Sequence, residues 1–329
     1  MITAYRAQGA RLVPLDLNAQ SLREALWIDL EHPSAAEEDA VEAALGIGIP
    51  TREDMQEIEA SSRVYVEGGV LFLTAQVLAT RPPGQGETSY DIGPVTFVLM
   101  QDRLVTVHYH HPGSFKFFAD WAARHDTALN CGVNALLGLM ESVVDRLADV
   151  LEGEARKLDA LSRNIFDSNR PASQSERLSL VLQRIGRAED LNGKVKESLA
   201  TVMRMLNALA VPGLQGVHPL LAGLEKTQLK SLLQDLKSLR EVASAQAEKI
   251  RFQLDATLGV INIRQSDIVK LFSVVAFVFL PPTLIASIYG MNFDVMPELR
   301  WSWGYPMALV AMLVSAVLPW LFFRWKKWL

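Results

Sequence analysis

One face of a single predicted helix carries side chains whose oxygen atoms could serve a cation. Its members are three or four residues apart, so they lie on the same side of an α-helix. They are Asp255, Gly259, Asn262, Ser266, Val269, Ser273, Ala276, Leu280, Thr283 and Ser287. This face could line a path for the cation. It could also pack against another helix, because small and hydroxyl residues favour packing between membrane helices. Two helices cannot enclose a pore, so conduction along this face would require several subunits.

The segment Tyr289-Gly290-Met291-Asn292-Phe293 follows at the end of this face. A glycine at such a place is typical of a helix that ends with a left-handed cap and turns into a loop. A specialised loop that presents the Asn292 side chain is the other interpretation. Spacing alone favours neither of them.

The helix that carries this face is expected to cross a membrane. The uncharged stretch 271–289 has 19 residues, and a second apolar run extends from Trp301 to Phe323. Each run matches the roughly 20 residues that a helix needs to span a bilayer core. The short segment between them contains two acids and one arginine, whereas basic residues flank the pair. The positive-inside rule therefore predicts a hairpin with both chain termini in the cytoplasm and the loop outside.

Composition narrows the functional classes. The chain has 329 residues, of which 50% are hydrophobic, so a large core outside the membrane is expected. Residues 1–15 lack the continuous apolar segment of a signal peptide. The single Cys131 excludes an internal disulfide framework and is expected to be a small core residue. A net charge of −5 argues against a nucleic-acid binder. No phosphate-binding loop or nucleophile–base pair is recognisable, so we expect neither an enzyme nor a bound cofactor.

The chain is expected to divide into three parts. Residues 1–130 alternate strand-like and helix-like patterns, with helix starts at Ser34 and Thr51, and predict a cytoplasmic α/β domain. Residues 131–270 show long helical periodicity and predict a helical region with a stalk helix. Residues 271–329 are the transmembrane hairpin. The stalk has no proline before Pro281, so one helix of more than 60 residues should continue into the membrane and require lateral partners.

Several motifs together resemble the CorA family of divalent-cation channels. They are the Gly290-Met291-Asn292 triad, Met296-Pro297-Glu298-Leu299, the Trp-Ser-Trp-Gly-Tyr-Pro segment that begins at Trp301, and the basic C-terminus. The resemblance covers essentially the whole chain and is most specific over residues 279–306. It implies a funnel-shaped homopentamer in a bacterial inner membrane. Such a channel would admit hydrated magnesium passively, and also cobalt and nickel, through a pore lined by the first span.

The resemblance also implies a selectivity filter. Five Asn292 side chains, aimed by Gly290 and Met291, would contact the hydrated ion through neutral amide oxygens. Mg²⁺ binds oxygen and releases its waters reluctantly, and a weak ring of this kind lets the ion leave again. Glu298 in the outer loop would attract cations electrostatically.

Further roles follow from the same resemblance. Thr283 would add a hydroxyl ring, and the apolar constrictions would come from Leu280, Val269 and Phe272. Asp255 would place a carboxylate at the cytoplasmic mouth, although a solvated helix charge explains it as well. The remaining pore-lining residues would be Ser287, Ser273, Ser266 and Asn262. Gating by cytoplasmic magnesium would use carboxylates between subunits, for which the candidates are Asp91, Glu87 and Asp235.

Two other functions compete with the CorA-type channel. His108, His110 and His111 form a local cluster that could bind zinc, although three ligands within four residues are crowded and structural roles are favoured. A ZntB-like zinc transporter, which could be coupled to protons, shares this architecture. The second competitor is a membrane scaffold or regulator that kept the fold and does not conduct. Measurement of ion flux distinguishes all three.

Overall fold

The computed structural model describes residues 1–57, 59–81, 89–127, 129–166, 174–211, 221, 223–292 and 296–326. The chain divides into two compact units. The first comprises Met1–Ala172 and Ser179–Gln253, and the second comprises Ser173–Leu178 and Leu254–Leu329. A single helix, α8 (Gly223–Tyr289), contributes to both units.

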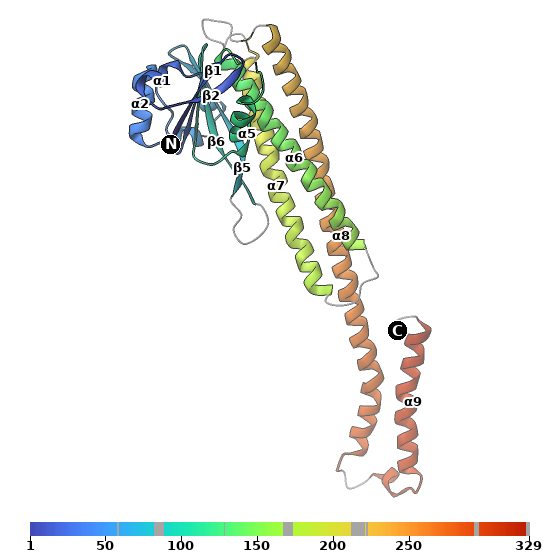
Figure 1. Cartoon of the computed structure of the whole chain (residues 1–329). Helices are drawn as coiled ribbons and strands as arrows, with labels where there is room; N and C mark the ends of the chain where they lie inside the picture. The colour runs from blue at the N-terminus through green and yellow to red at the C-terminus, as the bar shows by residue number, and fades with distance from the viewer. Residues whose placement is uncertain are drawn as a thin grey trace. The chain divides into compact units, whose positions relative to one another are not determined.

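A seven-stranded mixed sheet forms the centre of the first unit (Figure 1). Its strands are β1 (Ile2–Gln8), β2 (Arg11–Leu15), β3 (Trp27–Glu31), β4 (Val64–Glu67), β5 (Val70–Arg81), β6 (Ser89–Leu99) and β7 (Leu104–His108). Their order is β2-β1-β3-β7-β6-β5-β4, and only β3 and β7 pair in parallel. Every residue of β7 is buried, as expected for a central strand that is covered on both faces.

Helices cover both faces of the sheet. Successive side chains of a strand point to opposite faces, so Trp27 and Ile28 belong to different hydrophobic clusters. The cluster around Ile28 includes residues of the short helices α1 (Ala19–Glu24), α2 (Ala35–Leu45) and α3 (Arg52–Gln56). The cluster around Trp27 includes residues of α5 (Gly113–Ala122) and of the long helices. A one-turn helix, α4 (Ala60–Arg63), precedes β4.

Three long helices extend this second cluster into a helical bundle. They are α6 (Gly132–Phe166), α7 (Gln174–Leu209) and the part of α8 that belongs to the first unit, and they lie alongside one another in Figure 1. The buried side chains of α8 alternate at steps of three and four, which is the spacing of helices in coiled-coil contact. They are Leu229, Leu232, Leu236, the half-buried Leu239, Ala243, Gln246, Ile250 and Gln253. Cys131 is half-buried against the same cluster.

The second unit contains the end of α8, the 3₁₀ turn η2 (Pro297–Arg300) and α9 (Gly304–Trp325). The most apolar segments of α8 and α9 have mean hydropathies of 2.2 and 2.1, and only 6% and 11% of them are buried in the structure. A helix in the core of a soluble protein would be mostly buried, so this exposure favours two membrane spans.

Several local predictions are confirmed. Ser34 and Thr51 are the N-caps of α2 and α3, where the Glu37 and Asp54 carboxylates accept the cap N–H groups at 2.9 and 3.0 Å. The stalk helix has 67 residues. Other features differ from the expectation. The sequence interpretation missed β1, and α9 begins at Gly304 rather than at Trp301, because the chain first turns with Gly304 N–H donating to Trp301 O at 2.9 Å.

Candidate ion pathway

The predicted polar face is exposed on α8. Of its ten residues from Asp255 to Ser287, nine are exposed and Ser273 is half-buried. Val269 and Leu280 are 57% and 66% exposed, and Phe272 beside this face is 70% exposed. Large apolar side chains on an open helix face indicate that lipid or a further protein surface covers them in the membrane.

The opposite side of α8 is sheltered by α9. Val274 is 4% exposed, and on α9 the buried residues include Ala308 and Phe323. The Phe277 and Phe323 rings lie 5.8 Å apart between centroids and join the two helices, which run side by side in Figure 1. The small residues Gly304 and Ala308 near the start of α9 are also buried. Helix α9 therefore covers one side of α8 and leaves the polar face free.

The prediction omitted one residue of this face. Leu284 is 58% exposed and lies one turn beyond Leu280, on the same side of α8. Continuing the steps of three and four from Leu280 through residue 284, as well as through Thr283, would have found it.

Two hydroxyl groups of the face donate to the backbone of their own helix. Thr283 Oγ1 donates to Phe279 O at 2.6 Å, and Ser273 Oγ donates to Val269 O at 2.8 Å. A hydroxyl has one proton, so the lone pairs of these oxygens are what remains for a partner outside the helix. Acceptor-only oxygens suit a cation or the hydrogen atoms of its water shell.

The turn after α8 does not have the left-handed glycine cap that was one of the two interpretations of Gly290. Gly290 lies outside the left-handed region, since it is absent from the residues of positive φ. Instead its N–H donates to Ala286 O at 2.9 Å, and Met291 N–H donates to Ile288 O at 3.3 Å, so the last turn tightens. An added Cβ at Gly290 would lie 3.1 Å from Ala286 O. Met291 and Asn292 are exposed.

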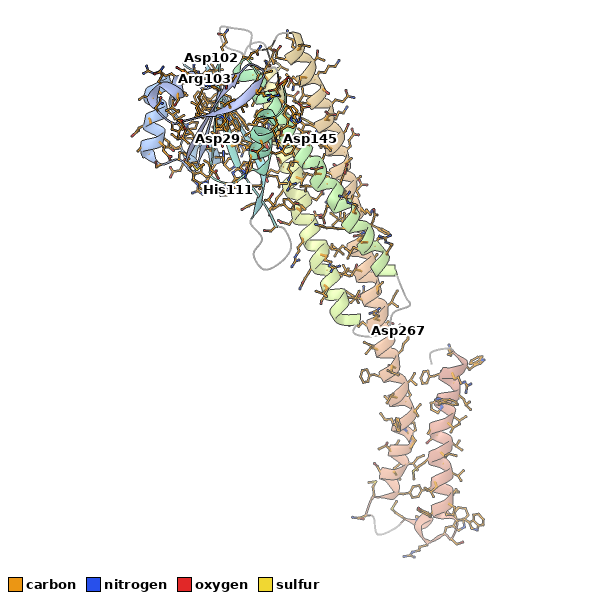
Figure 2. All side chains as sticks on the ribbon, viewed as in Figure 1. Asp29, Asp102, Arg103, His111, Asp145 and Asp267 are labelled. Atoms are coloured by element: carbon orange, nitrogen blue, oxygen red, sulfur yellow. The ribbon has the colours of Figure 1, made fainter. Side chains whose placement is uncertain are left out.

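Other candidate residues are only partly described. The backbone of Glu298 belongs to η2, but its side chain, like the whole of Glu87, lies outside the described residues. Asp255 is exposed on α8. Asp235 lines a cavity of about 410 Å³ between α6 and α8 together with Glu141. Burial raises the pKa of the nearby Asp145 (Figure 2), and the charges of Asp149 and Asp235 raise it further.

The histidine cluster is engaged by hydrogen bonds within the protein. His108, only 2% exposed, donates to Asp29 Oδ1 at 2.9 Å and to His110 O at 2.6 Å, so both ring nitrogens carry protons. Figure 2 places Asp29 among the strands of the sheet. Burial lowers the pKa of His110 to about 4, and His111 pairs with Glu31. Within the described part of the chain, no group of three or more His, Cys, Asp or Glu residues could hold a metal. Each of the three histidines is thus paired with another group of the same unit.

Stability should fall as the pH rises from about 6.5 through the folded-state pKa of His108, because the stabilising proton is then lost. Burial lowers the pKa of His108, but the hydrogen bond and charge of Asp29 outweigh burial and raise the pKa above 6.5. The folded state thus binds the proton more tightly than the unfolded state. The stabilisation is complete below the unfolded pKa and is lost as the pH passes the folded pKa. Thermal unfolding midpoints of the parent should decline more steeply than those of H108Q between about pH 6.5 and 9; equal slopes would contradict this assignment.

Comparisons with known proteins agree over the whole chain. The model of the CorA-like Mg²⁺ transporter protein family matches residues 23–327. Curated relatives include the magnesium transport protein CorA of Yersinia pseudotuberculosis, 34% identical over 331 residues, and that of Escherichia coli K12, 33% identical over 330 residues. Each alignment covers 100% of both chains.

Solved structures share the fold. The complete CorA magnesium transporter of Methanocaldococcus jannaschii has a TM-score of 0.75 at 17% identity, covering 100% of this chain and 99% of that one. The full-length CmaX protein has a TM-score of 0.69 at 17% identity, covering 99% of this chain and 97% of that one. At these identities the likeness concerns the fold alone.

Proposed function

The chain belongs to the CorA family of Mg²⁺ transporters, and from this premise we propose that it carries hydrated magnesium across a membrane, and also cobalt and nickel. The path runs along the exposed face of α8 from Asp255 to Ser287. The observation that carries this proposal is the placement of that face opposite the side that α9 shelters. A face of oxygen-bearing and small residues left free in this way is suited to line a passage rather than to meet lipid.

The passage requires several copies of the chain. One α8 presents only one wall of such a path, so further copies are needed to enclose it. A homopentamer, as the family resemblance implies, would surround the path with five copies of α8 and place α9 on the lipid side. In this arrangement Leu280, Val269 and Phe272 form apolar constrictions that gate by dewetting.

Selectivity is assigned to the outer end of the path. Asn292 would present neutral amide oxygens to the hydrated ion, and the tight turn through Gly290 and Met291 would aim them. Thr283, whose hydroxyl donates to Phe279 O, would add a ring of acceptor oxygens. Mg²⁺ keeps several of its waters, so contacts through water hold the ion weakly enough for it to leave. Ser287, Ser273, Ser266 and Asn262 line the rest, and Glu298 would concentrate cations outside.

The membrane potential is a sufficient source of energy. Inward movement of a divalent ion yields about 4.6 kcal/mol per 100 mV, at about 2.3 kcal/mol for each charge. We place the protein in a bacterial-type inner membrane, as the family resemblance implies. Both termini lie in the cytoplasm, as the basic residues around the two spans predict.

Uptake into liposomes that contain the purified full-length chain tests the function. Magnesium, cobalt, nickel and zinc are compared with and without a pH gradient. Uptake of magnesium and cobalt that is independent of the gradient is expected. Zinc uptake that follows the gradient would identify a zinc transporter instead, and absence of any uptake would favour a non-conducting scaffold.

Asp255→Ala should change the block or gating of this uptake by magnesium on the cytoplasmic side. Loss of five carboxylates at the mouth is expected to shift the half-inhibitory concentration by about fivefold, which corresponds to about 1 kcal/mol. Asp267→Ala is the matched control, because Asp267 is also exposed on α8 but pairs with Lys270 at 3.0 Å (Figure 2). An unchanged response in Asp255→Ala would leave Asp255 as an ordinary surface charge.

A further inference from the structure

Three buried amide side chains interrupt the apolar core of the helical bundle. Gln246 and Gln253 occupy successive equivalent positions in the seven-residue repeat of α8, and Asn192 lies in the buried face of α7. They are 6%, 0% and 3% exposed, respectively. A polar residue at such a core position costs stability, but it specifies how helices align.

The two glutamines make the same contact one repeat apart. Gln246 Nε2–H donates to Leu151 O of α6 at 2.8 Å, and Gln253 Nε2–H donates to Leu158 O at 2.8 Å. Donor and acceptor are separated by 95 residues in both cases, so α6 and α8 run parallel with one constant alignment. Asn192 Nδ2–H donates to Ala243 O at 3.0 Å and joins α7 to the same stretch of α8.

We propose that Gln246 and Gln253 form a register clamp that holds α8 at one axial position along α6. Sliding by part of a turn would remove the acceptors from both N–H groups, and a buried donor without an acceptor is costly. Sliding by a whole turn would move the polar amide groups into the apolar layers of the core that Ile250 and Leu158 now fill. Leucine packing alone discriminates less sharply, because apolar contacts are not directional.

The clamp has a consequence for transport, which rests on the proposed function. Helix α8 continues without interruption from the clamp to Tyr289, and its far end carries the proposed path. Helix α8 can therefore shift along its axis only if α6 shifts with it. In the transport cycle α8 moves together with α6 and does not slide along it.

Chemical cross-linking of the full-length chain, with Cys131 replaced by alanine, tests the clamp. Lys249 of α8 pairs with Asp159 of α6, so D159C with K249C marks the native register. D159C with A245C marks α8 displaced by one turn. With both glutamines present, only the native pair should react with a short methanethiosulfonate cross-linker. In the Q246L/Q253L background the displaced pair should react too. The surface ion pair is absent from both cysteine pairs and does not account for the difference.

Single substitutions and a matched control complete this test. Q246L and Q253L each retain one hydrogen bond, so their displaced pairs should react to an extent between those of the parent and the double variant. This comparison remains informative if the double variant fails to fold. Q234L replaces an exposed glutamine of the same helix and should behave like the parent. Displaced-pair reaction at the parent level in all glutamine variants would overturn the clamp.

Reversible cross-linking of the native pair tests the consequence for transport. Liposomes with cross-linked D159C/K249C should take up magnesium at the rate measured after a reductant releases the link. Uptake that is lost on cross-linking and restored by the reductant would show that α8 must slide along α6, which would overturn this part of the inference. Absence of uptake in the parent chain under reducing conditions would contradict the proposed function and leave the register result standing.

Discussion

Asn292→Ala is expected to reduce divalent-cation uptake by at least about 100-fold while the chain stays folded and oligomeric. A hydrogen bond to a charged group contributes about 1.5–3 kcal/mol, and the variant loses one amide acceptor in every subunit. A loss of about 3 kcal/mol corresponds to about 100-fold in rate. Asn292 is exposed beyond the end of α8, so its truncation removes no core packing. Initial rates of magnesium and cobalt uptake into liposomes measure the effect.

Two further variants make this result specific. Asn207→Ala also removes an exposed asparagine amide, but one that donates to Met203 O of its own helix, and it should transport normally. Asn292→Asp keeps the oxygen atoms and adds charge, so it should bind the ion more tightly and release it more slowly. Normal uptake by Asn292→Ala would rule out the selectivity ring while leaving the α8 path open to test.

Gly132→Ala should lower the free energy of unfolding by at least about 3 kcal/mol, at the upper end of the usual cost of overpacking. A Cβ at this position would lie 2.2 Å from Arg103 O and 2.7 Å from Met100 O, both of them backbone atoms. Arg103 O is held in the β6–β7 turn, where it accepts Met100 N–H at 3.0 Å. The turn cannot yield without loss of that hydrogen bond, so α6 would move away from the sheet. Chemical unfolding of the full-length chain measures the loss.

Gly153→Ala is the matched control on the same helix. No atom lies within 4 Å of a Cβ at Gly153, and alanine is a better helix former than glycine by about 0.8–1 kcal/mol. This variant should therefore be slightly more stable than the parent. Equal stability of Gly132→Ala and the parent would mean that the contact between α6 and the β6–β7 turn is looser than the structure has it.

The sequence alone was sufficient to predict those features that depend on residues close together in the chain. Caps at Ser34 and Thr51 were predictable, because acids three residues later complete the local hydrogen bonds. The length of α8 followed from the absence of proline before Pro281, although Pro281 and Pro282 themselves lie inside the helix. The two spans followed from uninterrupted apolar runs. The polar face from Asp255 to Ser287 was recognisable because its side chains recur at helical spacing, independent of anything outside α8.

Contacts between distant segments were decided only by the tertiary structure. Nothing near His108 in the sequence predicts its charge, which depends on Asp29, 79 residues earlier. Gly290 suggested a left-handed cap, but the tightened final turn of α8 satisfied the backbone without it. The register of α8 against α6 depends on buried amides that reach carbonyls 95 residues away. Sequence periodicity determines which face of a helix is buried. Only packing in three dimensions determines which residues meet at that face, because each layer of an apolar repeat can pack against more than one layer of a neighbouring helix.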